Sequence, residues 1–414
     1  MYKKALLSTD PITAFPGYVD NGGIFIRKKY LFAIISHYSM TLWYNGRNME
    51  NIHINSLNIE TYRGIKNLCL EGFSGINIIT GDNNCGKTSV MELLHTVAEP
   101  TQIQLWLLHI RRISSPSKNI TFYEGLIDLF DKEETDSPKI KYSIVDSSKK
   151  EHVITVTYKI RPEAVSTRIA NRLSLMKFST EEKQIVANRL DLSFDYNSQE
   201  NKDYKIYEFQ DYLGVLPIEE NVPVICKPVV YVSPTAHGNN FLYLKEILND
   251  SELYPEMLSI LQDFDPDIIS INQYVSRVSS NYYCGILTKK FKNALPLNMY
   301  GDGMKKAILL MSAVVAAKGG ILLIDEFETA IHTSAMTKIY AWILKTCKKL
   351  NIQLFLTTHS KEALQKVLAL NSESDLKDDI TLFTLYKREE KTIVRKLSAE
   401  RAIEADENFN QELR

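Results

Sequence analysis

The stretch that decides the fold reads Gly81-Asp82-Asn83-Asn84-Cys85-Gly86-Lys87-Thr88, and Ser89 follows it. It matches the phosphate-loop pattern G-x-x-x-x-G-K-[ST] at every fixed position. A glycine turn that only reverses the chain would match the glycines, but it would not need a lysine and a threonine in register. We therefore predict that residues 81–89 form a P-loop that binds the phosphate groups of a nucleotide.

The residues on either side of this stretch predict a strand before it and a helix after it. Residues 76–80 form a short apolar run, and apolar residues then recur at helical spacing from Val90 to Val97. In this setting the glycines let backbone N–H groups face the phosphates. With ATP as the nucleotide, we expect Lys87 to contact the β and γ phosphates and the Thr88 hydroxyl to bind Mg²⁺.

A second apolar run, residues 321–324, ends in the two carboxylates Asp325 and Glu326. Parallel strands bring their carboxyl ends to one edge of a sheet, so these side chains should lie beside the P-loop. We expect Asp325 to hold Mg²⁺ and Glu326 to orient or deprotonate the attacking water. An apolar run followed by Asp-Glu is common by itself. Its occurrence in the same chain as a P-loop favours the interpretation that these two acids belong to a nucleotide site.

A histidine follows the next predicted strand, residues 352–356, in the stretch Thr357-Thr358-His359-Ser360. His359 would emerge at the same sheet edge, where it could hydrogen-bond to the γ-phosphate or to the water. A lone histidine is more often a capping or core residue, but its place after a strand favours a functional role. We predict that Lys87, Glu326 and His359 are the catalytic residues.

A glycine-rich turn, Gly301-Asp302-Gly303, opens the helix predicted at residues 305–318. Glycine-rich backbone at a helix start is a second anion-binding device. One nucleotide needs one phosphate cradle, so we expect this loop to serve the γ-phosphate held by a neighbouring copy of the chain. The hypothesis implies a head-to-tail dimer with two composite sites, and a plain turn with a helix cap is the alternative.

The rest of the chain divides around these motifs. We expect residues 49–99 and 226–414 to form the two parts of a nucleotide-binding domain, with residues 100–225 inserted between them as a lobe. Helix and strand alternate from residue 297 onward, which predicts parallel strands with right-handed crossovers. The fold class is therefore α/β, a P-loop NTPase with a mixed sheet and an inserted α+β lobe.

Local patterns give further expectations about single elements. They predict an antiparallel edge hairpin at residues 52–70, an acidic loop at residues 131–136, strands at residues 141–145 and 153–160, and helical stretches at residues 167–189 and 241–264. Strand-like alternation begins only after residue 51. We therefore expect residues 1–48 to lie outside the ancestral fold, with Met49 as an alternative start.

The composition argues against several classes of protein. A net charge of −1 gives no whole-chain attraction to nucleic acid, so DNA binding would need a local patch such as residues 289–292. Five scattered cysteines without a C-x-x-C pair indicate a reducing cytoplasm and argue against a disulfide framework or a zinc site. The apolar run at residues 30–44 is too short for a bilayer, which takes roughly 20 apolar residues, so we expect no membrane partner and no transport role.

The order of these motifs resembles the OLD-family-type ATPases, relatives of the SMC and RecF-like ATPases. The resemblance covers most of residues 49–414 and rests on the P-loop, residues 301–303, residues 323–326, Glu328-Thr329-Ala330-Ile331-His332 and residues 357–360. It implies an ABC-ATPase-like fold and a stand-alone AAA family ATPase. In such a protein Gly301 to Gly303 would be the signature loop, residues 328–332 the D-loop between subunits, and His359 the switch histidine. Lys306 lies where, as we align them, many members have arginine.

The resemblance also implies partners. Only 55 residues follow His359, so we expect this chain to lack the TOPRIM nuclease domain of longer members. It would then form a homodimer or higher homo-oligomer and act with a separately encoded effector, as in two-gene antiviral defence. One hypothesis is an ATPase switch, and the other is a nucleotide-gated scaffold with little turnover. Glu326 and His359 favour the ATPase, because a scaffold needs no water-activating groups, and binding of DNA stays open.

Overall fold

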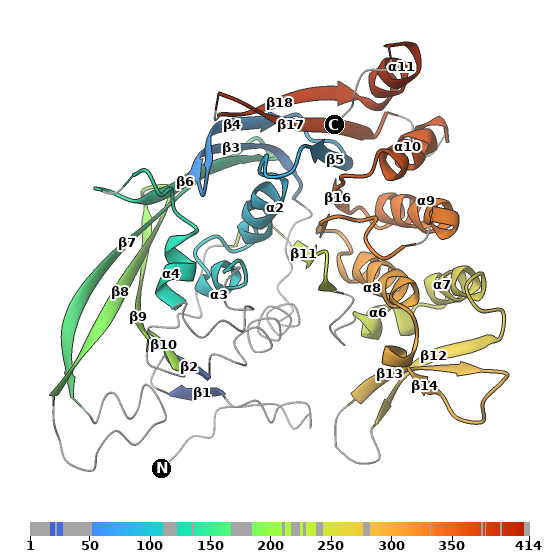
Figure 1. The fold of residues 1–414 in the computed structure, drawn as a ribbon, viewed down its shortest axis with the longest axis horizontal. Helices are drawn as coiled ribbons and strands as arrows, with labels where there is room; N and C mark the ends of the chain where they lie inside the picture. Colours follow the sequence, from blue (N-terminus) through green and yellow to red (C-terminus); the bar gives the residue numbers. More distant parts are fainter. Residues whose placement is uncertain are drawn as a thin grey trace. The chain divides into compact units, whose positions relative to one another are not determined.

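The fold is described by a computed structural model, drawn as a ribbon in Figure 1. The described residues are 17–20, 23–27, 52–110, 122–134, 136–166, 184–208, 212–216, 224–226, 229–236, 243–275, 282–331, 333–373, 376, 378–389 and 391–409. They form two compact units: unit 1 comprises residues 1–48, 57–68 and 96–225, and unit 2 comprises residues 49–56, 69–95 and 226–414. No helix in these described ranges combines the length and the apolar character that crossing a membrane requires.

Unit 2 is built on a six-stranded mixed sheet. Its strands, in order across the sheet, are β11 (Val229–Val232), β15 (Ile321–Ile324), β16 (Gln353–Thr357), β5 (Ile76–Gly81), β17 (Ile380–Arg388) and β18 (Lys391–Ser398). The first five strands run parallel, and β18 pairs antiparallel with β17. Every residue of β5, β15 and β16 is buried, as parallel strands covered on both faces must be. The predicted mixed α/β fold of the P-loop class is confirmed.

Seven helices of unit 2 accompany this sheet in the described residues. They are α2 (Lys87–Thr96), α6 (Leu244–Leu248), α7 (Leu253–Gln262), α8 (Asp302–Ala316), α9 (Thr333–Lys349), α10 (Lys361–Ala369) and α11 (Ala399–Phe409). Helix α2 follows β5, α9 follows β15 and α10 follows β16, which is the predicted alternation. Eleven of the fifteen residues of α8 are buried, so it is a core helix. Figure 1 shows α8, α9 and α10 in a row, and α8 also contacts α6 and α7.

A small antiparallel sheet in unit 2 precedes α8 in the chain. It contains β12 (Ile268–Val275), β13 (Tyr282–Thr288) and β14 (Leu295–Pro296). The 3₁₀ turn η4 (Leu297–Met299) connects β14 to the start of α8, and a second such turn, η5 (Leu370–Ser372), follows α10. The hydroxyl of Tyr254 donates to the carbonyl of Ile271 at 3.1 Å and accepts from its N–H at 3.0 Å, which holds α7 against β12.

Unit 1 carries most of a nine-stranded sheet. In order across the sheet, its strands are β1 (Gly17–Asp20), β2 (Gly23–Arg27), β10 (Tyr212–Leu216), β9 (Glu200–Glu208), β8 (Gln184–Tyr196), β7 (Glu151–Ser166), β6 (Lys139–Asp146), β3 (Ile54–Tyr62) and β4 (Ile65–Glu71). The short helices α3 (Ile103–Leu107) and α4 (Phe122–Ile127) belong to the same unit. Buried Trp106 on α3 contacts the rings of Tyr142 and Phe194, so α3 anchors a core against β6 and β8. The predicted edge hairpin is the β3–β4 pair, which ends the sheet.

Two predicted helical stretches are wrong in part. Residues 184–189 begin strand β8 and pair with β7, whereas residues 167–183 lie outside the described residues. This segment forms a strand because every second residue after it is buried: Leu190, Leu192 and Phe194 lie on one face of β8. The stretch predicted at residues 241–264 contains two helices, because the carboxylate of Asp250 accepts the N–H groups of residues 252 and 253 and starts α7 anew.

The N-terminal segment takes part in the sheet in two short pieces. β1 pairs with β2, and β2 pairs with β10, while the other residues before 52 lie outside the described ranges. The division of the chain into an N-terminal extension, a split nucleotide-binding domain and an inserted lobe stays a prediction.

Candidate active site

The P-loop lies between β5 and α2 and needs both of its glycines. Gly81 has φ 134° and Gly86 has φ 104°, conformations that side chains other than hydrogen rarely adopt. A Cβ atom on Gly81 would lie 1.9 Å from the carbonyl oxygen of Leu385 on β17. Asp82, Asn83 and Asn84 at the turn of the loop are exposed, whereas Cys85 is buried. The backbone of the loop therefore passes close to β17, and its N–H groups are left accessible to an anion.

Lys87 holds this loop together from its inner side. The side chain is buried, and Nζ donates to the carbonyl oxygens of Gly81 and Asp82, both at 2.7 Å. Its ammonium also lies 3.7 Å from Sγ of Cys85. Lys87 is the first residue of α2, so a positive charge and the N-terminus of a helix coincide where the phosphates would bind.

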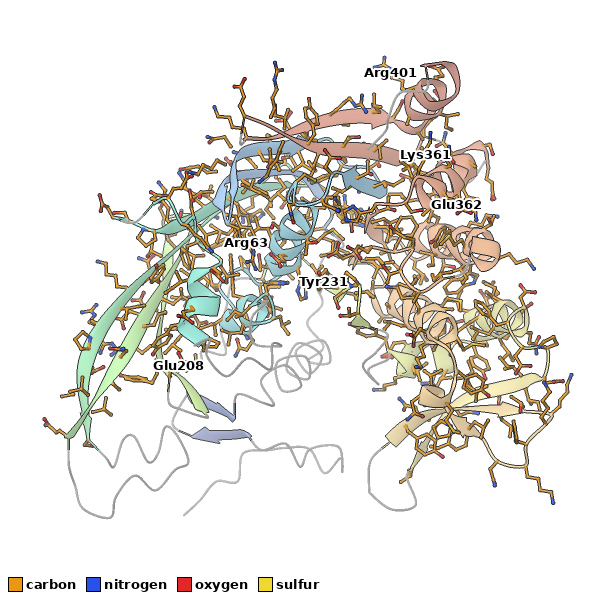
Figure 2. All side chains as sticks on the ribbon, viewed as in Figure 1. Arg63, Glu208, Tyr231, Lys361, Glu362 and Arg401 are labelled. Atoms are coloured by element: carbon orange, nitrogen blue, oxygen red, sulfur yellow. The ribbon has the colours of Figure 1, made fainter. Side chains whose placement is uncertain are left out.

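Asp325 is held rigidly at the end of β15. It is 1% exposed. The hydroxyl of Thr357 donates to its Oδ1, and the hydroxyl of Tyr231 donates to its Oδ2 at 3.2 Å. Figure 2 labels Tyr231 on β11. A buried carboxylate with two hydroxyl donors keeps one orientation, as a metal ligand needs.

Glu326 adopts a strained backbone conformation beside it. Its φ is 47°, which lies in the left-handed region. This conformation is energetically unfavourable for any residue that has a side chain. The backbone N–H of Glu326 donates to the hydroxyl of Thr357 at 2.8 Å. On its half-exposed side chain, Oε1 lies 3.6 Å from Nε2 of His359, and Oε2 accepts from the hydroxyl of Thr329 at 3.4 Å. The predicted base and the predicted switch histidine therefore face each other.

Strand register carries these groups to the edge where the P-loop begins. Ile324 on β15 is level with Leu356 on β16, and Leu356 is level with Ile78 on β5. Beyond the end of β16, the N–H of Thr358 donates to the carbonyl of Ile79 at 3.2 Å. The carboxyl ends of β5, β15 and β16 are thus aligned, as predicted for parallel strands.

The expected D-loop connects this edge to the start of α10. Oε1 of Glu328 accepts the N–H groups of His359 at 3.0 Å and Ser360 at 3.2 Å. The Ser360 hydroxyl in turn accepts from the N–H of Ala363 and caps α10. Glu328 therefore fixes the backbone that presents His359. His332, the last residue of the expected D-loop, lies outside the described residues.

The Gly301–Gly303 turn lies at the start of α8. Gly301 is the N-cap, and both Gly301 and Asp302 are exposed. A Cβ atom on Gly303 would lie 3.2 Å from the carbonyl oxygen of Ala330, so the turn fits closely beside the expected D-loop. Within one chain the turn thus neighbours residues 328–331. That it binds a nucleotide of a second copy stays a prediction.

One buried cation lies near the acidic groups. Lys306 on α8 is 0% exposed, and its Nζ has no hydrogen-bond partner among the described residues. Burial lowers the pKa of Lys306 to about 8, although the charges of Glu328, Asp325 and Glu326 act to raise it. No sequence pattern indicated that Lys306 is buried, and none indicated a role for Thr357 or Tyr231. Thr357 could have been suspected, since it ends a strand two residues before His359.

The donor groups suit the ligands that the P-loop pattern implies. The described residues contain no group of three or more His, Cys, Asp or Glu side chains that could hold a metal by themselves. Mg²⁺ is usually held by one or two carboxylates together with phosphate oxygens and water. The hydroxyl of Thr88 and the carboxylate of Asp325 are oxygen ligands that could bind Mg²⁺ together with the phosphates. The residues therefore fit a magnesium nucleotide rather than a metal cage made of protein alone.

Two family models match separate parts of the chain. One, described as "AAA domain, putative AbiEii toxin, Type IV TA system", matches residues 230–364. The other, described as "AAA ATPase domain", matches residues 53–220. The first match contains the Gly301–Gly303 turn, the acidic end of β15 and His359, and the second contains the P-loop.

Three known proteins are similar to all or part of this chain. An "ATP/GTP phosphatase" from Helicobacter pylori is 27% identical over 367 residues, covering 83% of this chain and 95% of the relative. The DNA replication and repair protein RecF from Acinetobacter baumannii is 40% identical over 47 residues, 11% of this chain and 13% of RecF. An Smc head domain from Pyrococcus furiosus, solved with the C-terminal domain of ScpA, has a TM-score of 0.44 at 11% identity and covers 87% of this chain and 100% of its own. The chain therefore combines a P-loop α/β fold with two separate segments that are similar to ATPase domains.

Proposed function

We propose that the protein binds ATP with Mg²⁺ and hydrolyses it to ADP and phosphate. The observation that carries the proposal is the pairing of Glu326 with His359, 3.6 Å apart. A buried carboxylate, Asp325, stands beside them on a strand aligned with the P-loop strand. A protein that only bound nucleotide would need the loop but not this strained acid. The name of the Helicobacter pylori relative, an ATP/GTP phosphatase, supports hydrolysis and leaves GTP as an alternative substrate.

Each residue has a role that follows from its position. The N–H groups of residues 82–89 bind the phosphates, and Lys87 exchanges its contacts with two carbonyl oxygens for phosphate oxygens. Thr88 and Asp325 hold the metal, which neutralises charge on the phosphates when it is bound. Glu326 accepts a proton from the attacking water or orients it, and His359 hydrogen-bonds to the γ-phosphate and positions the carboxylate of Glu326.

A second copy of the chain completes the site in this proposal. The exposed N-terminus of α8, with Gly301 and Asp302, presents backbone N–H groups and the positive end of a helix dipole. In a head-to-tail dimer these groups bind the γ-phosphate of the partner's ATP, so hydrolysis opens the dimer. The switch acts in the cytoplasm on a separately encoded effector, in antiviral defence or DNA maintenance. The family description that names a Type IV TA system and the RecF match support these two settings.

The test is steady-state ATP hydrolysis by the purified protein, with particle mass measured with and without ATP. Lys87→Ala should lose binding and turnover, and Glu326→Gln should bind ATP, lose at least about a hundredfold in turnover and remain dimeric. Glu362→Gln is the control, because Glu362 is an exposed acid on α10 that pairs with Lys366 at 2.9 Å. Wild type that binds ATP without hydrolysing it would replace this proposal with the nucleotide-gated scaffold.

A further inference from the structure

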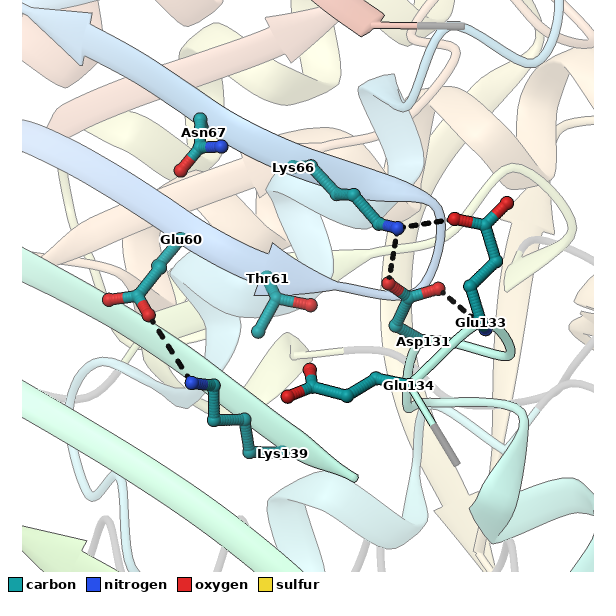
Figure 3. A pocket seen from close by; sticks show the side chains of 8 residues that line it. All are labelled: Glu60, Thr61, Lys66, Asn67, Asp131, Glu133, Glu134 and Lys139. Atoms are coloured by element: carbon teal, nitrogen blue, oxygen red, sulfur yellow. Dashed lines mark hydrogen bonds and ion pairs between the residues drawn. The ribbon is translucent and has the colours of Figure 1, made fainter. Parts of the chain in front are cut away.

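Unit 1 contains a cavity that no candidate active-site residue lines. Its volume is about 400 Å³. The lining residues, drawn in Figure 3, are Glu60, Thr61, Lys66, Asn67, Asp131, Glu133, Glu134 and Lys139. Strands β3 and β4 supply the first four, the acidic loop after α4 supplies the next three, and Lys139 begins β6. The acidic loop predicted from the sequence therefore forms one wall of a cavity.

Lys66 partly neutralises the negative charge of the acidic loop. Its Nζ lies 2.8 Å from Oδ2 of Asp131 and 2.5 Å from Oε2 of Glu133. Burial alone would raise the pKa of Asp131, but hydrogen bonds from Lys66 and from the N–H of Glu133 outweigh it and lower the pKa. The same contacts raise the pKa of Lys66. Asp131 and Lys66 are therefore both charged at neutral pH, and the single ammonium of Lys66 is shared by the carboxylates of Asp131 and Glu133.

The balance of charge in the cavity remains negative. Lys139 and Lys141 both pair with Glu60, at 3.6 Å and 2.6 Å. Glu134 makes no ion pair with any described residue. The lining holds four carboxylates and two ammonium groups, and counting Lys141 as a third still leaves one negative charge. Glu134, the lining carboxylate without an ion-pair partner among the described residues, is only half-buried and can meet a ligand from solvent.

An orphaned hydroxyl gives the second, independent observation. Thr61 is 5% exposed, and its Oγ1 has no hydrogen-bond partner in the part of the chain that the structure describes. Figure 3 shows this oxygen turned toward the loop that carries Asp131 and Glu134. Buried hydroxyls are almost always hydrogen-bonded, so an unpaired one that faces a cavity indicates a missing donor or acceptor there.

The chemistry of the lining selects the class of ligand. A metal ion is disfavoured, because the described residues hold no cluster of three metal-ligating side chains and Lys66 already occupies two of the acids. The net negative charge repels an anion. The cavity is far larger than the roughly 30 Å³ of one water. An organic cation with N–H donors satisfies both the free carboxylate and the free hydroxyl.

We propose that this cavity binds the ammonium or guanidinium group of an organic cation, with Glu134 as its charge partner and Thr61 as a hydrogen-bond acceptor. Two sources present that chemistry. One is a free small amine, such as a diamine, and the other is a lysine or arginine side chain of a partner protein. Both make the same contacts with the cavity, and neither depends on ATP.

Calorimetric titration of the full chain tests this proposal. The probes are putrescine and agmatine as free amines, and acetyl-Gly-Lys-Gly-amide and acetyl-Gly-Arg-Gly-amide as side-chain mimics. Butane-1,4-diol, which has the length of putrescine and no charge, is the control ligand. At least one cationic probe should bind saturably, more weakly at higher salt, and the diol should not bind. Preference for the peptides identifies a protein partner, and preference for the free amines identifies a small metabolite.

Three variants connect the binding to the cavity. Glu134→Gln should weaken binding about tenfold or more, and Thr61→Val about threefold to tenfold, because valine keeps the shape and removes the hydroxyl. Glu151→Gln, which changes an exposed acid outside the cavity, should bind like wild type. Thr61→Val removes an unpaired group, so its melting temperature should not fall. Absence of saturable binding by every probe, or wild-type affinity in both cavity variants, overturns the proposal.

Discussion

Replacing Lys306 by methionine should make the protein more stable at neutral pH. The lysine is fully buried on α8 with no hydrogen-bond partner for Nζ among the described residues. Burial lowers its pKa from 10.5 to about 8, and each pKa unit corresponds to about 1.4 kcal/mol. The charged lysine therefore costs the folded state about 3 kcal/mol. The attraction of the nearby carboxylates is already included, because it acts to raise this pKa.

The sign of the pH dependence follows from the two pKa values. Below pH 8 the lysine is protonated in both the folded and the unfolded state, so the full cost is present. Between pH 8 and 10.5 only the unfolded state binds the proton, and rising pH therefore stabilises the folded state. Lys306→Met has no such proton. Its advantage over the parent protein should be about 3 kcal/mol at pH 7 and should shrink to about 1 kcal/mol at pH 9.5.

Urea unfolding at several pH values measures this difference. Tryptophan fluorescence in a shared Trp43→Phe, Trp106→Phe background reports on unit 2 alone, since Trp342 lies in α9. Lys305→Met is the control, because Lys305 pairs with Asp302 at 3.0 Å and is not fully buried. A lower stability of Lys306→Met at pH 7, or a difference that does not change with pH, would refute the reasoning. Either result would mean that Nζ has a compensating partner.

Three further predictions concern the candidate active site. Gly81→Ala should abolish binding of a fluorescent ATP analogue, because the new Cβ would strike a carbonyl oxygen at 1.9 Å; binding of unchanged affinity would contradict the loop geometry. Thr357→Val leaves Oδ1 of Asp325 and the N–H of Glu326 without their partner, so it should cost about 2–3 kcal/mol of stability and more than about tenfold in turnover, while Thr357→Ser should retain most of both. His359→Ala should lower turnover about tenfold to a hundredfold with little change in ATP affinity; a large loss of affinity instead would assign His359 to nucleotide binding.

The sequence predicted the parts of the site that depend on local pattern. The P-loop, the acidic end of β15 and the strand before His359 are each contained in a few consecutive residues, and strand alternation then brings them to one edge. The hydroxyl of Thr357, which joins Asp325 to Glu326, depends on the register of two strands. No pattern in either strand alone contains that information.

Other features were hidden by tertiary context. Lys306 follows a lysine at the start of a helix, and such lysines usually reach solvent; its burial results from how α8 contacts its neighbours. Strand β8 has Asn188 and Arg189 before its alternating apolar residues, so the segment resembled a polar helix until its pairing with β7 is seen. The cavity around Thr61 joins segments about 70 residues apart and has no signature in either of them.

The position of β5 has a consequence for how the chain is made. This strand comes early in the sequence, yet both of its neighbours in the sheet come late. Thr80 bonds to a residue 278 positions further on, and Gly75 to one 304 positions further on. At about 5–20 residues per second, a ribosome needs roughly 15–60 s to add a stretch of that length. For all of that time the P-loop strand is an apolar segment with two unpaired edges, so the nucleotide site is among the last parts of a new molecule to form, and early chaperone binding should protect it.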